Sequence, residues 1–490
     1  LRYRTPCARL PLRQQAPMAV DLAPEVRGLS QNKIALDELM GRMGVGRFQA
    51  CLLLACGLGF GSGAVEHSLN GFLMIEVREE WHSNQYMLST LPTVAEAGVI
   101  VGSFFWGRMA DLYGRRPAFT ITALLVVIFA VASACSVDLT MLAILRFGVG
   151  FGYGGNISAD FALFSEMMPT LGRGHMLFGL CFFWPASQAM TCALAWLIIP
   201  GHGWRTFLVV CAVPYAIACF LRFLIPESPR WLLLQGRQEE AEEVCRGIAF
   251  VNGLDSEQLG FSKGTKLTLS EEDQHLVSQS QKTPTSHFLQ KLFSKNLWRT
   301  TLALILAEGL LAWGFTVSAA FMPTFLEAKG MEATDRYRTM LLSAFSQFLG
   351  TALAAACGIY IGRRRPLQVS LLIVGFALAC FAEVRPESLV LVCSCLASAS
   401  IEFGYALKNV YMTEVFPTEL RGTGPALTSA VGTAMSLATP VLTAVVLAVG
   451  STELCAVVFA VAMLLGSVLL WFLLDQETMD ADLLDRVASA

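Results

Sequence analysis

Long apolar stretches dominate the chain, and short polar segments separate them. Each stretch holds few charges and is close to the ~20 residues that an α-helix needs to cross a bilayer. The pattern predicts twelve membrane helices, at about 48–75, 86–106, 117–135, 139–164, 176–199, 204–225, 297–326, 340–361, 367–382, 389–412, 423–449 and 454–474. The predicted fold class is therefore an all-α polytopic membrane protein.

The helices fall into two sets of six with a long polar segment between them. This order predicts a tail at 1–46, a six-helix bundle at 47–225, a linker at 226–296, a second bundle at 297–475 and a tail at 476–490. Within the linker, residues 238–250 have the apolar spacing of an amphipathic surface helix. Residues 254–290 are polar and rich in Ser and Gln, and we expect this segment to be mobile.

Composition agrees with this class and excludes others. Of 490 residues, 54% are hydrophobic and 15% are charged, whereas soluble domains have about 25% charged residues. The chain contains no G-x-x-x-x-G-K-S/T loop, so ATP-driven pumping is not expected, and neither is an enzyme. The 14 cysteines lie mostly in apolar runs, and Cys393-x-Cys395 does not have the spacing or context of a zinc site. We therefore expect no metal and no cofactor.

Arginine is concentrated in one set of loops. Because Lys and Arg mark the cytoplasmic side of a membrane protein, we expect both termini to be cytoplasmic. The loops on this side carry Arg108, Arg115, Arg116, Arg173, Arg363, Arg364, Arg365 and Arg421. The sequence does not decide between the plasma membrane and an intracellular vesicle membrane.

Two polar motifs repeat at the same offset. Residues 107–116 read GRMADLYGRR, and Gly362-Arg363-Arg364 follows Gly114-Arg115-Arg116 by 248 residues. The segment 166–174, with Glu, Pro, Thr, Arg and Gly at fixed spacing, returns at 414–422 with the same 248-residue offset. Two unrelated motifs at one offset indicate a duplicated half, and hence two bundles related by a pseudo-two-fold axis.

These motifs, together with Arg146-x-x-x-Gly150 and the 226–230 box PESPR, resemble the major facilitator superfamily on its sugar-porter and organic-ion-transporter side. The likeness to the synaptic-vesicle-protein-related transporters is the strongest. It implies alternating access and ion pairs that gate the cytoplasmic face, for which the candidates are Asp111, Arg115, Glu166, Arg173, Glu227, Arg230, Glu414 and Arg421. The alternative for these residues is loop anchoring alone.

The chain departs from the pattern of these relatives at three places. Ile359 stands where the second copy of the loop motif would carry an acid, and Gly63 occupies the position of the usual helix 1 aspartate, with Glu66 three residues later. The seventh helix lacks the paired glutamines of sugar porters, which argues against a sugar substrate.

Ionisable side chains at membrane depth are the candidates for binding substrate or a proton, because each is costly there unless paired or wet. They are Glu66, Glu96, Arg146, Asp160, Glu308, Glu402 and Lys408. Simpler roles exist for some: Lys408 reaching the interface, Arg146 bonding backbone carbonyls, and Glu96 held protonated against a neighbouring helix. His67 and Trp184 are expected to be packing residues. Asp160 and Lys408 are repeat equivalents, and we expect them to face each other as an ion pair.

Five acids against two bases favour a cationic or polar substrate, or acids that bind a coupling proton. The main hypothesis is a secondary transporter of a small organic ion or polar metabolite, with proton coupling as a further expectation. A facilitative sugar or polyol porter is one alternative, and a non-transporting receptor or vesicle structural protein on the same scaffold is another. The expected partners are a small-molecule substrate, protons and the lipid bilayer, without nucleic acid, and we expect a monomer.

Overall fold

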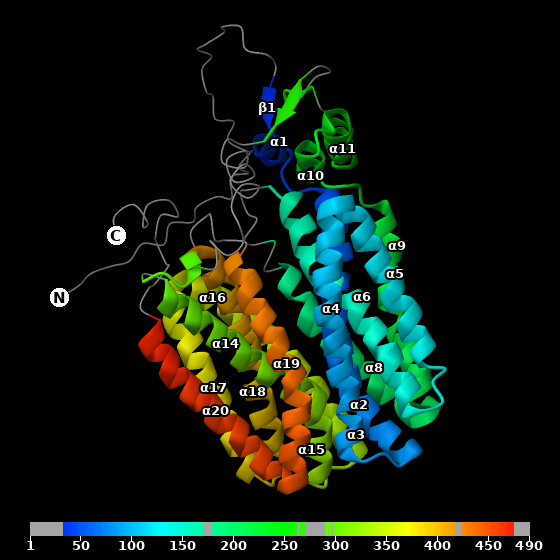
Figure 1. Ribbon diagram of the computed structural model, residues 1–490, viewed down its shortest axis with the longest axis vertical. Helices are drawn as coiled ribbons and strands as arrows, with labels where there is room; N and C mark the ends of the chain where they lie inside the picture. The colour runs from blue at the N-terminus through cyan, green and yellow to red at the C-terminus, as the bar shows by residue number, and fades with distance from the viewer. Residues whose placement is uncertain are drawn as a thin grey trace, which may run out of the picture.

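The structure is a computed structural model that describes residues 33–169, 176, 179–255, 257–261, 265–269, 290–295, 297–416 and 423–474. Long helices make up most of it (Figure 1). In the first half they are α2 (Arg47–Trp81), α4 (Thr90–Tyr113), α5 (Arg115–Ser133), α6 (Leu139–Glu166), α8 (Phe183–Cys211) and α9 (Val213–Leu224), with the short α3 (Gln85–Leu88). In the second half they are α14 (Trp298–Thr316), the π-helix η1 (Val317–Phe321), α15 (Met322–Ala328), α16 (Ala333–Tyr360), α17 (Arg364–Glu383), α18 (Glu387–Val415), α19 (Thr423–Val449) and α20 (Thr452–Leu473).

The described helices account for the twelve predicted membrane passes. Ten are long and apolar enough to cross a bilayer, judged by length and composition, and one of these is the 46-residue run Gly179–Leu224. That run contains two passes, because Gly203 takes a non-helical conformation (φ 74°, ψ 172°) that reverses the chain inside α8. A further pass is α6, whose apolar part Leu139–Gly155 is shorter. The seventh pass is continuous through α14, η1 and α15.

The helices form two bundles, one from each half of the chain (Figure 1). The bundles approach each other near α3 and α15 and diverge toward the end where α10 (Pro229–Leu234) and α11 (Gln238–Val251) lie. We call these two ends of the molecule the α3 end and the linker end. Between the bundles, α4 packs against α19, α2 against η1, and α8 against α16.

Glycine contacts inside each bundle repeat with the sequence offset. A Cβ atom placed on Gly102 of α4 would meet the backbone of Phe151 of α6 at 2.8 Å from its carbonyl carbon. A Cβ atom on Gly350 of α16 would meet the carbonyl carbon of Ala399 of α18 at 3.0 Å. Both positions of this contact recur 248 residues later, with Ala399 in the place of Phe151, so the two bundles share a helix-packing contact as well as loop motifs. Such close approach is what small residues provide in membrane helices.

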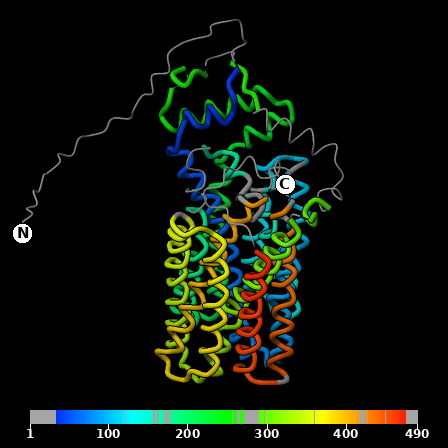
Figure 2. Tube along the Cα trace, turned by 90° about the vertical axis from the view of Figure 1, so that its left-hand side faces the viewer, coloured from blue at the N-terminus to red at the C-terminus, as the bar shows by residue number. Residues whose placement is uncertain are grey.

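A small subdomain stands on the linker end of the first bundle (Figure 2). Strand β1 (Lys33–Ala35) pairs in parallel with β2 (Lys266–Thr268), and α1 (Leu36–Met43) follows β1. The backbone N–H of Phe48 donates to Asn252 Oδ1 at 2.9 Å, which fixes the end of α11 to the start of α2. Residues 33–46 are therefore part of a folded unit rather than a tail, and a strand forms inside 254–290, the segment that was expected to be mobile. Pairing between segments more than 200 residues apart leaves no local pattern to read.

The ends of two passes also differ from expectation. Helix α2 continues to Trp81, through charged residues that were expected to form a loop, and α16 already begins at Ala333. The polar residues extend these helices beyond their apolar parts because they find partners there. Arg78 bonds to Glu327, and Glu80 to Trp204 and Arg205.

Candidate functional site

Buried charged side chains mark the candidate site, since each is costly at membrane depth unless it is paired or wet. Among the described residues, five acids and three bases are buried: Glu66, Glu96, Asp160, Glu308 and Glu402, with Arg146, Arg222 and Lys408. Arg222 was missed by the sequence analysis. The available signal was a single arginine within the apolar run 213–225.

Three ion pairs hold six of these charges. Arg146 Nη1 lies 3.0 Å from Glu66 Oε2, and Arg222 Nη2 lies 2.6 Å from Asp160 Oδ1. Lys408 Nζ contacts Glu308 Oε2 in the second half. The pairs join α6 with α2, α9 with α6, and α18 with α14. Each pair therefore lies within one bundle, and its charges cancel inside that bundle.

The expected ion pair between Asp160 and Lys408 is wrong in this structure. Each residue has a partner of opposite charge on a neighbouring helix of its own bundle, Arg222 for Asp160 and Glu308 for Lys408. The repeat correctly makes the two residues equivalent in position, but Asp160 pairs with Arg222 and Lys408 pairs with Glu308 instead of with each other. Lys408 also does not reach the interface, because its side chain is 3% exposed and bonded inside the bundle.

Two glycines of α2 make room for the buried polar groups of the first bundle. A Cβ atom on Gly59 would collide with Arg222 Nη2 and would lie 2.5 Å from Asp160 Oδ2. A Cβ atom on Gly63 would collide with the Tyr153 hydroxyl. The acid that the family carries at this position has no space here. Glu66, one helical turn further on, is the acid that reaches Arg146.

Two buried acids lie outside the three ion pairs. Glu96 on α4 has His67 of α2 as its neighbour, with 3.1 Å between Glu96 Oε1 and His67 Nδ1. Glu402 on α18 is 6% exposed. The His67 ring lies 5.3 Å from Phe315, and Phe315 lies 6.3 Å from Tyr405, which is one helical turn from Glu402 on α18. The two acids therefore come from opposite bundles and converge on one region.

Aromatic rings fill the boundary between the bundles in this region. Trp184 of α8 lies 5.4 Å from Phe315 of α14, measured between ring centroids, and Phe315 lies 6.3 Å from Tyr405 of α18. His67 lies 5.3 Å from Phe315 and 6.0 Å from Trp184. Trp184 and His67, expected to be packing residues, thus belong to a cluster shared by both halves, which we call the boundary aromatic cluster (His67, Trp184, Phe315 and Tyr405).

Four of the eight gating candidates have described side chains, and all four contact the first bundle or the linker subdomain. Arg115 Nε lies 3.7 Å from Glu166 Oε1, and Arg230 Nη2 lies 2.6 Å from Asp37 Oδ1. Glu227 accepts hydrogen bonds from the backbone N–H groups of Arg115 and Arg116 at 3.0 Å each, at the start of α5. The side chains of Asp111 and Glu414 lie outside the described part, as do residues Arg173 and Arg421. A gating role for these eight residues stays a prediction.

The described ion pair between the bundles lies at the opposite end. Arg78 Nη2 of α2 lies 2.5 Å from Glu327 Oε1 of α15, and Arg336 Nη1 of α16 lies 3.6 Å from Glu327 Oε2. Beside it, the rings of Phe72 and Tyr337 lie 5.7 Å apart. We call Arg78, Glu327 and Arg336 the α3-end clasp. The sequence analysis assigned gating to the linker end only and read 327–338 as a loop, so this clasp was missed.

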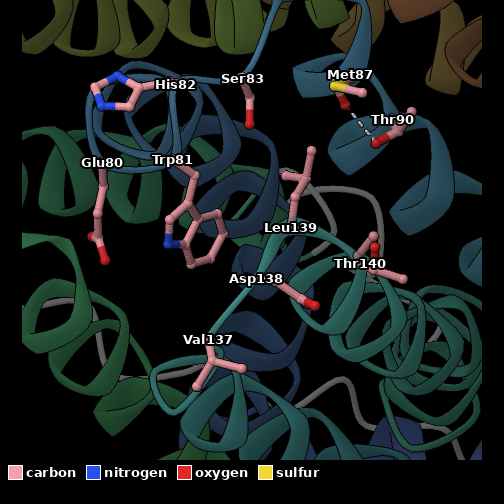
Figure 3. Close-up of a pocket in the computed structure, with 11 residues that line it drawn as sticks. Glu80, Trp81, His82, Ser83, Met87, Thr90, Val137, Asp138, Leu139 and Thr140 are labelled. Atoms are coloured by element: carbon pink, nitrogen blue, oxygen red, sulfur yellow. Dashed lines mark hydrogen bonds between the residues drawn. The ribbon is translucent and has the colours of Figure 1, made fainter.

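A separate cavity of about 700 Å³ also lies at the α3 end (Figure 3). Its lining residues run from Glu80 to Thr90 and from Val137 to Ala143, all in the first bundle. Glu80 already accepts hydrogen bonds from Trp204 Nε1 and Arg205 Nη1, and Asp138 accepts one from the Met141 backbone at the start of α6. Both acids of the cavity are thus already hydrogen-bonded within the first bundle, and none of its lining residues belongs to the second bundle.

Comparison with known proteins identifies the family to which this chain belongs. The sequence profile of the family described as "Sugar (and other) transporter" matches residues 63–481. The chain belongs to this family. It is an integral membrane transporter with the two-bundle architecture of the major facilitator superfamily.

The chain is similar to transporters and to vesicle-related proteins of different names. It is 27% identical to "Organic cation/carnitine transporter 7" of Arabidopsis thaliana, over 94% of this chain and 97% of that protein. It is 27% identical to "Synaptic vesicle 2-related protein" of Bos taurus, over 84% of this chain and 76% of that protein. The xylose transporter XylE from E. coli, solved in an inward open conformation, shares the fold with a TM-score of 0.71 and 16% identity, over 90% of this chain and 99% of that one.

The buried Asp160–Arg222 pair predicts a specific stability pattern. Arg222→Met leaves Asp160 with an uncompensated buried charge and should cost about 3–5 kcal/mol of stability. The double variant Arg222→Met with Asp160→Leu replaces the pair by apolar groups and should recover most of the loss. Thermal melting of the purified transporter measures both. Arg230→Met is the matched control, because its partly exposed pair with Asp37 should matter much less. A double variant no more stable than Arg222→Met would contradict this account.

The α3-end clasp predicts a shift between open and closed states at that end. Glu327→Arg removes the pair with Arg78 and places three cations together, so the bundles should part there more often. A cost of about 1 kcal/mol, typical of a partly exposed pair, changes the population about fivefold. Spin labels on Met87 and Thr334, one on each bundle, report the change as a longer distance. Adding Arg78→Glu should restore the wild-type distribution, and no difference among the three proteins would exclude the clasp.

Proposed function

We propose that this transporter carries a small organic cation by alternating access and couples the movement to protons. The observation that carries the proposal is the pair of acids left over when the buried ion pairs are counted. Five buried acids face three buried bases, and three ion pairs cancel six of these charges. Glu96 and Glu402 remain, one from each bundle, so the boundary region carries an excess of two carboxyl groups.

The boundary aromatic cluster supports a cationic substrate independently of the charge count. Trp184, Phe315 and Tyr405 come from both bundles and form a continuous series of ring contacts, with Tyr405 on the same helix as Glu402. A cation on the face of such a ring gains about 0.5–2 kcal/mol, and more when water is excluded. Carboxylates and aromatic faces together recognise an alkylammonium group: the acids supply charge, and the rings surround its apolar substituents.

The names of two similar proteins support an organic cation as substrate and a proton as the coupling ion. One is named as an organic cation and carnitine transporter and aligns along nearly the whole chain. A structural neighbour is described as a proton:xylose symporter, which supports a proton as the driving ion for this fold. Because that neighbour is only 18% identical, it supports the fold and does not indicate the substrate. The substrate is inferred from the side chains at the boundary between the bundles.

A neutral polyol is the second candidate, and one observation favours it. Gln188 Oε1 and Ser318 Oγ are buried polar atoms without a hydrogen-bond partner in the described protein. Hydroxyl groups of a polyol would satisfy such atoms. The two excess acids have no role for a neutral substrate unless they bind protons, and helix 7 lacks the paired glutamines of sugar porters, so we rank this candidate second.

The distribution of arginine gives the orientation of the transporter in the membrane. We infer that the linker end and both termini face the cytoplasm, since the arginine-rich loops belong to that end. The two bundles at 47–225 and 297–475 would rock about the boundary region, with the linker subdomain attached to the first. We further propose that the chain works as a monomer, that Asp111 and its seven companion residues gate the linker end, and that the α3-end clasp closes the other.

Uptake into proteoliposomes tests the proposal. With a pH gradient imposed, the wild-type protein should accumulate radiolabelled choline or tetraethylammonium, and xylitol is the neutral comparison. Of the glutamine variants at Glu66, Glu96, Glu308 and Glu402, at least one should lose pH-driven accumulation and keep counterflow exchange, because exchange needs no net proton movement. The structure ranks Glu96 and Glu402 first, as Gln at Glu66 or Glu308 would strand Arg146 or Lys408.

Glu387→Gln supplies the control, because Glu387 is an exposed acid on the same helix as Glu402. It should behave as the wild type. Accumulation of xylitol but of neither cation would replace the proposed substrate by the polyol. Unchanged pH-driven accumulation in all four buried-acid variants would refute the role of these acids in coupling.

A further inference from the structure

The contact between His67 and Glu96 differs chemically from the other buried pairs. His67 Nδ1 and Glu96 Oε1 lie 3.1 Å apart, and their side chains are 18% and 7% exposed. The other two pairs that involve Glu residues use arginine or lysine, which keep their charge over the ordinary pH range. Histidine is the side chain whose ordinary pKa lies closest to physiological pH, so in the His67–Glu96 dyad, unlike in the other pairs, the base as well as the acid is able to take up and release a proton.

The dyad also lies where the two halves meet. His67 of α2 and Glu96 of α4 belong to the first bundle. The His67 ring packs edge-on against Phe315 of the second bundle at 5.3 Å, and it lies 6.0 Å from Trp184. Any relative movement of the bundles therefore changes the surroundings of the imidazole directly. Glu66 and Asp160, held in pairs inside the first bundle, lack such a contact in the described structure.

We propose that His67 and Glu96 together hold the coupling proton of transport, an inference that rests on the proposed function above. With one proton the dyad has zero net charge, whether the proton is on Nδ1 or on the carboxyl group. When the proton leaves to the water on the open side, neutral imidazole and carboxylate remain, and the net charge becomes −1. No other atom changes its bonding, and proton and substrate are linked through this single unit of charge.

The charged and titratable groups around the dyad allow it to gain and lose this proton. They are Glu66 of α2 with Arg146 of α6, Tyr153 and Asp160 of α6 with Arg222 of α9, and Glu308, Glu402, Tyr405 and Lys408 of the second bundle. The helices α8 and α19 present no charged residue at this depth. The three cations are each bonded to another acid, so none permanently neutralises Glu96.

Trp184 offers a direct test that needs no substrate. Its indole lies beside the imidazole, and a charge that appears or disappears there changes the fluorescence of that tryptophan. The emission of the purified full chain is recorded against pH, and the spectrum of Trp184→Phe is subtracted to isolate Trp184. The wild-type difference signal should titrate. His67→Asn retains a hydrogen-bond donor near the Nδ1 position and cannot titrate, so it should abolish the imidazole contribution and shift the midpoint by about one pH unit or more, as expected for coupled groups.

Glu96→Gln should shift or remove the same transition, whereas Glu402→Gln should leave it near its wild-type midpoint. A Trp184 signal that does not depend on pH in the wild type would overturn the proposal. So would a transition that is unchanged in His67→Asn, which is the result that a purely structural role for His67 predicts because Asn keeps the hydrogen bond. A transition that is unchanged in Glu96→Gln would overturn the proposal as well.

Transport then separates this inference from the proposed function. In proteoliposomes, Glu96→Gln should lose pH-driven accumulation of tetraethylammonium, while counterflow exchange remains measurable but weaker than in the wild type, because Glu402 is then the one substrate-facing acid of the two that is left. If wild-type accumulation is pH-driven and survives in Glu96→Gln, the dyad is excluded as the coupling site and the proposed function stands. If the wild type transports the cation without any response to the pH gradient, proton coupling itself fails and takes the role of the dyad with it.

Discussion

An unpaired charge inside a bilayer is costly, and the structure of both bundles depends on that constraint. Moving an ion out of water costs several kcal/mol even after local relaxation, and a partner in good geometry offsets the cost only in part. The first bundle meets the constraint with Glu66–Arg146 and Asp160–Arg222, and the second with Glu308–Lys408. Because each pair is complete within its own bundle, the bundles can move relative to one another without breaking any of these three pairs.

The surfaces that the bundles share follow from the same constraint. At membrane depth they meet through aromatic rings such as Trp184 and Phe315, whose contacts change at modest cost. The described ion pair that crosses between them, Arg78 with Glu327, lies at the α3 end with both side chains about one-third exposed. Water reaches such a pair, so breaking it requires far less free energy than breaking a pair in the interior. The strong, buried ion pairs thus lie within each bundle, whereas the weaker, partly exposed pair joins one bundle to the other.

The sequence predicted those parts of this arrangement that have a local or repeated signal. Twelve apolar stretches, the arginine-rich loops and the 248-residue offset give the architecture, and seven of the eight buried charges stand out in apolar surroundings. Which charge meets which is a matter of side-chain reach across helices, and symmetry alone gave the wrong partner for Asp160. Arg222 was overlooked because it lies near the end of its apolar run. His67 looked like a packing residue because its acid partner is on another helix.

Long-range pairing was equally invisible. Strand β1 is three residues long and pairs with β2 across more than 200 residues, so neither strand has enough pattern to predict alone. The glycines of α2 present the reverse case. Gly59 and Gly63 were visible in the sequence, but their reason, space for Arg222 and for the Tyr153 hydroxyl, appears only in three dimensions.

We propose that two carboxyl groups, Glu96 and Glu402, remain uncompensated at the boundary and make the site selective for positive charge. The most direct measurement compares the affinity of the purified protein for two ligands of one shape: choline and its neutral carbon analogue 3,3-dimethylbutan-1-ol. Calorimetry should show choline bound at least about tenfold more tightly, a difference of about 1.4 kcal/mol, and the preference should disappear in the Glu96→Gln, Glu402→Gln double variant. Equal affinity for the two ligands in the wild type, or a preference that persists in the double variant, would contradict the account.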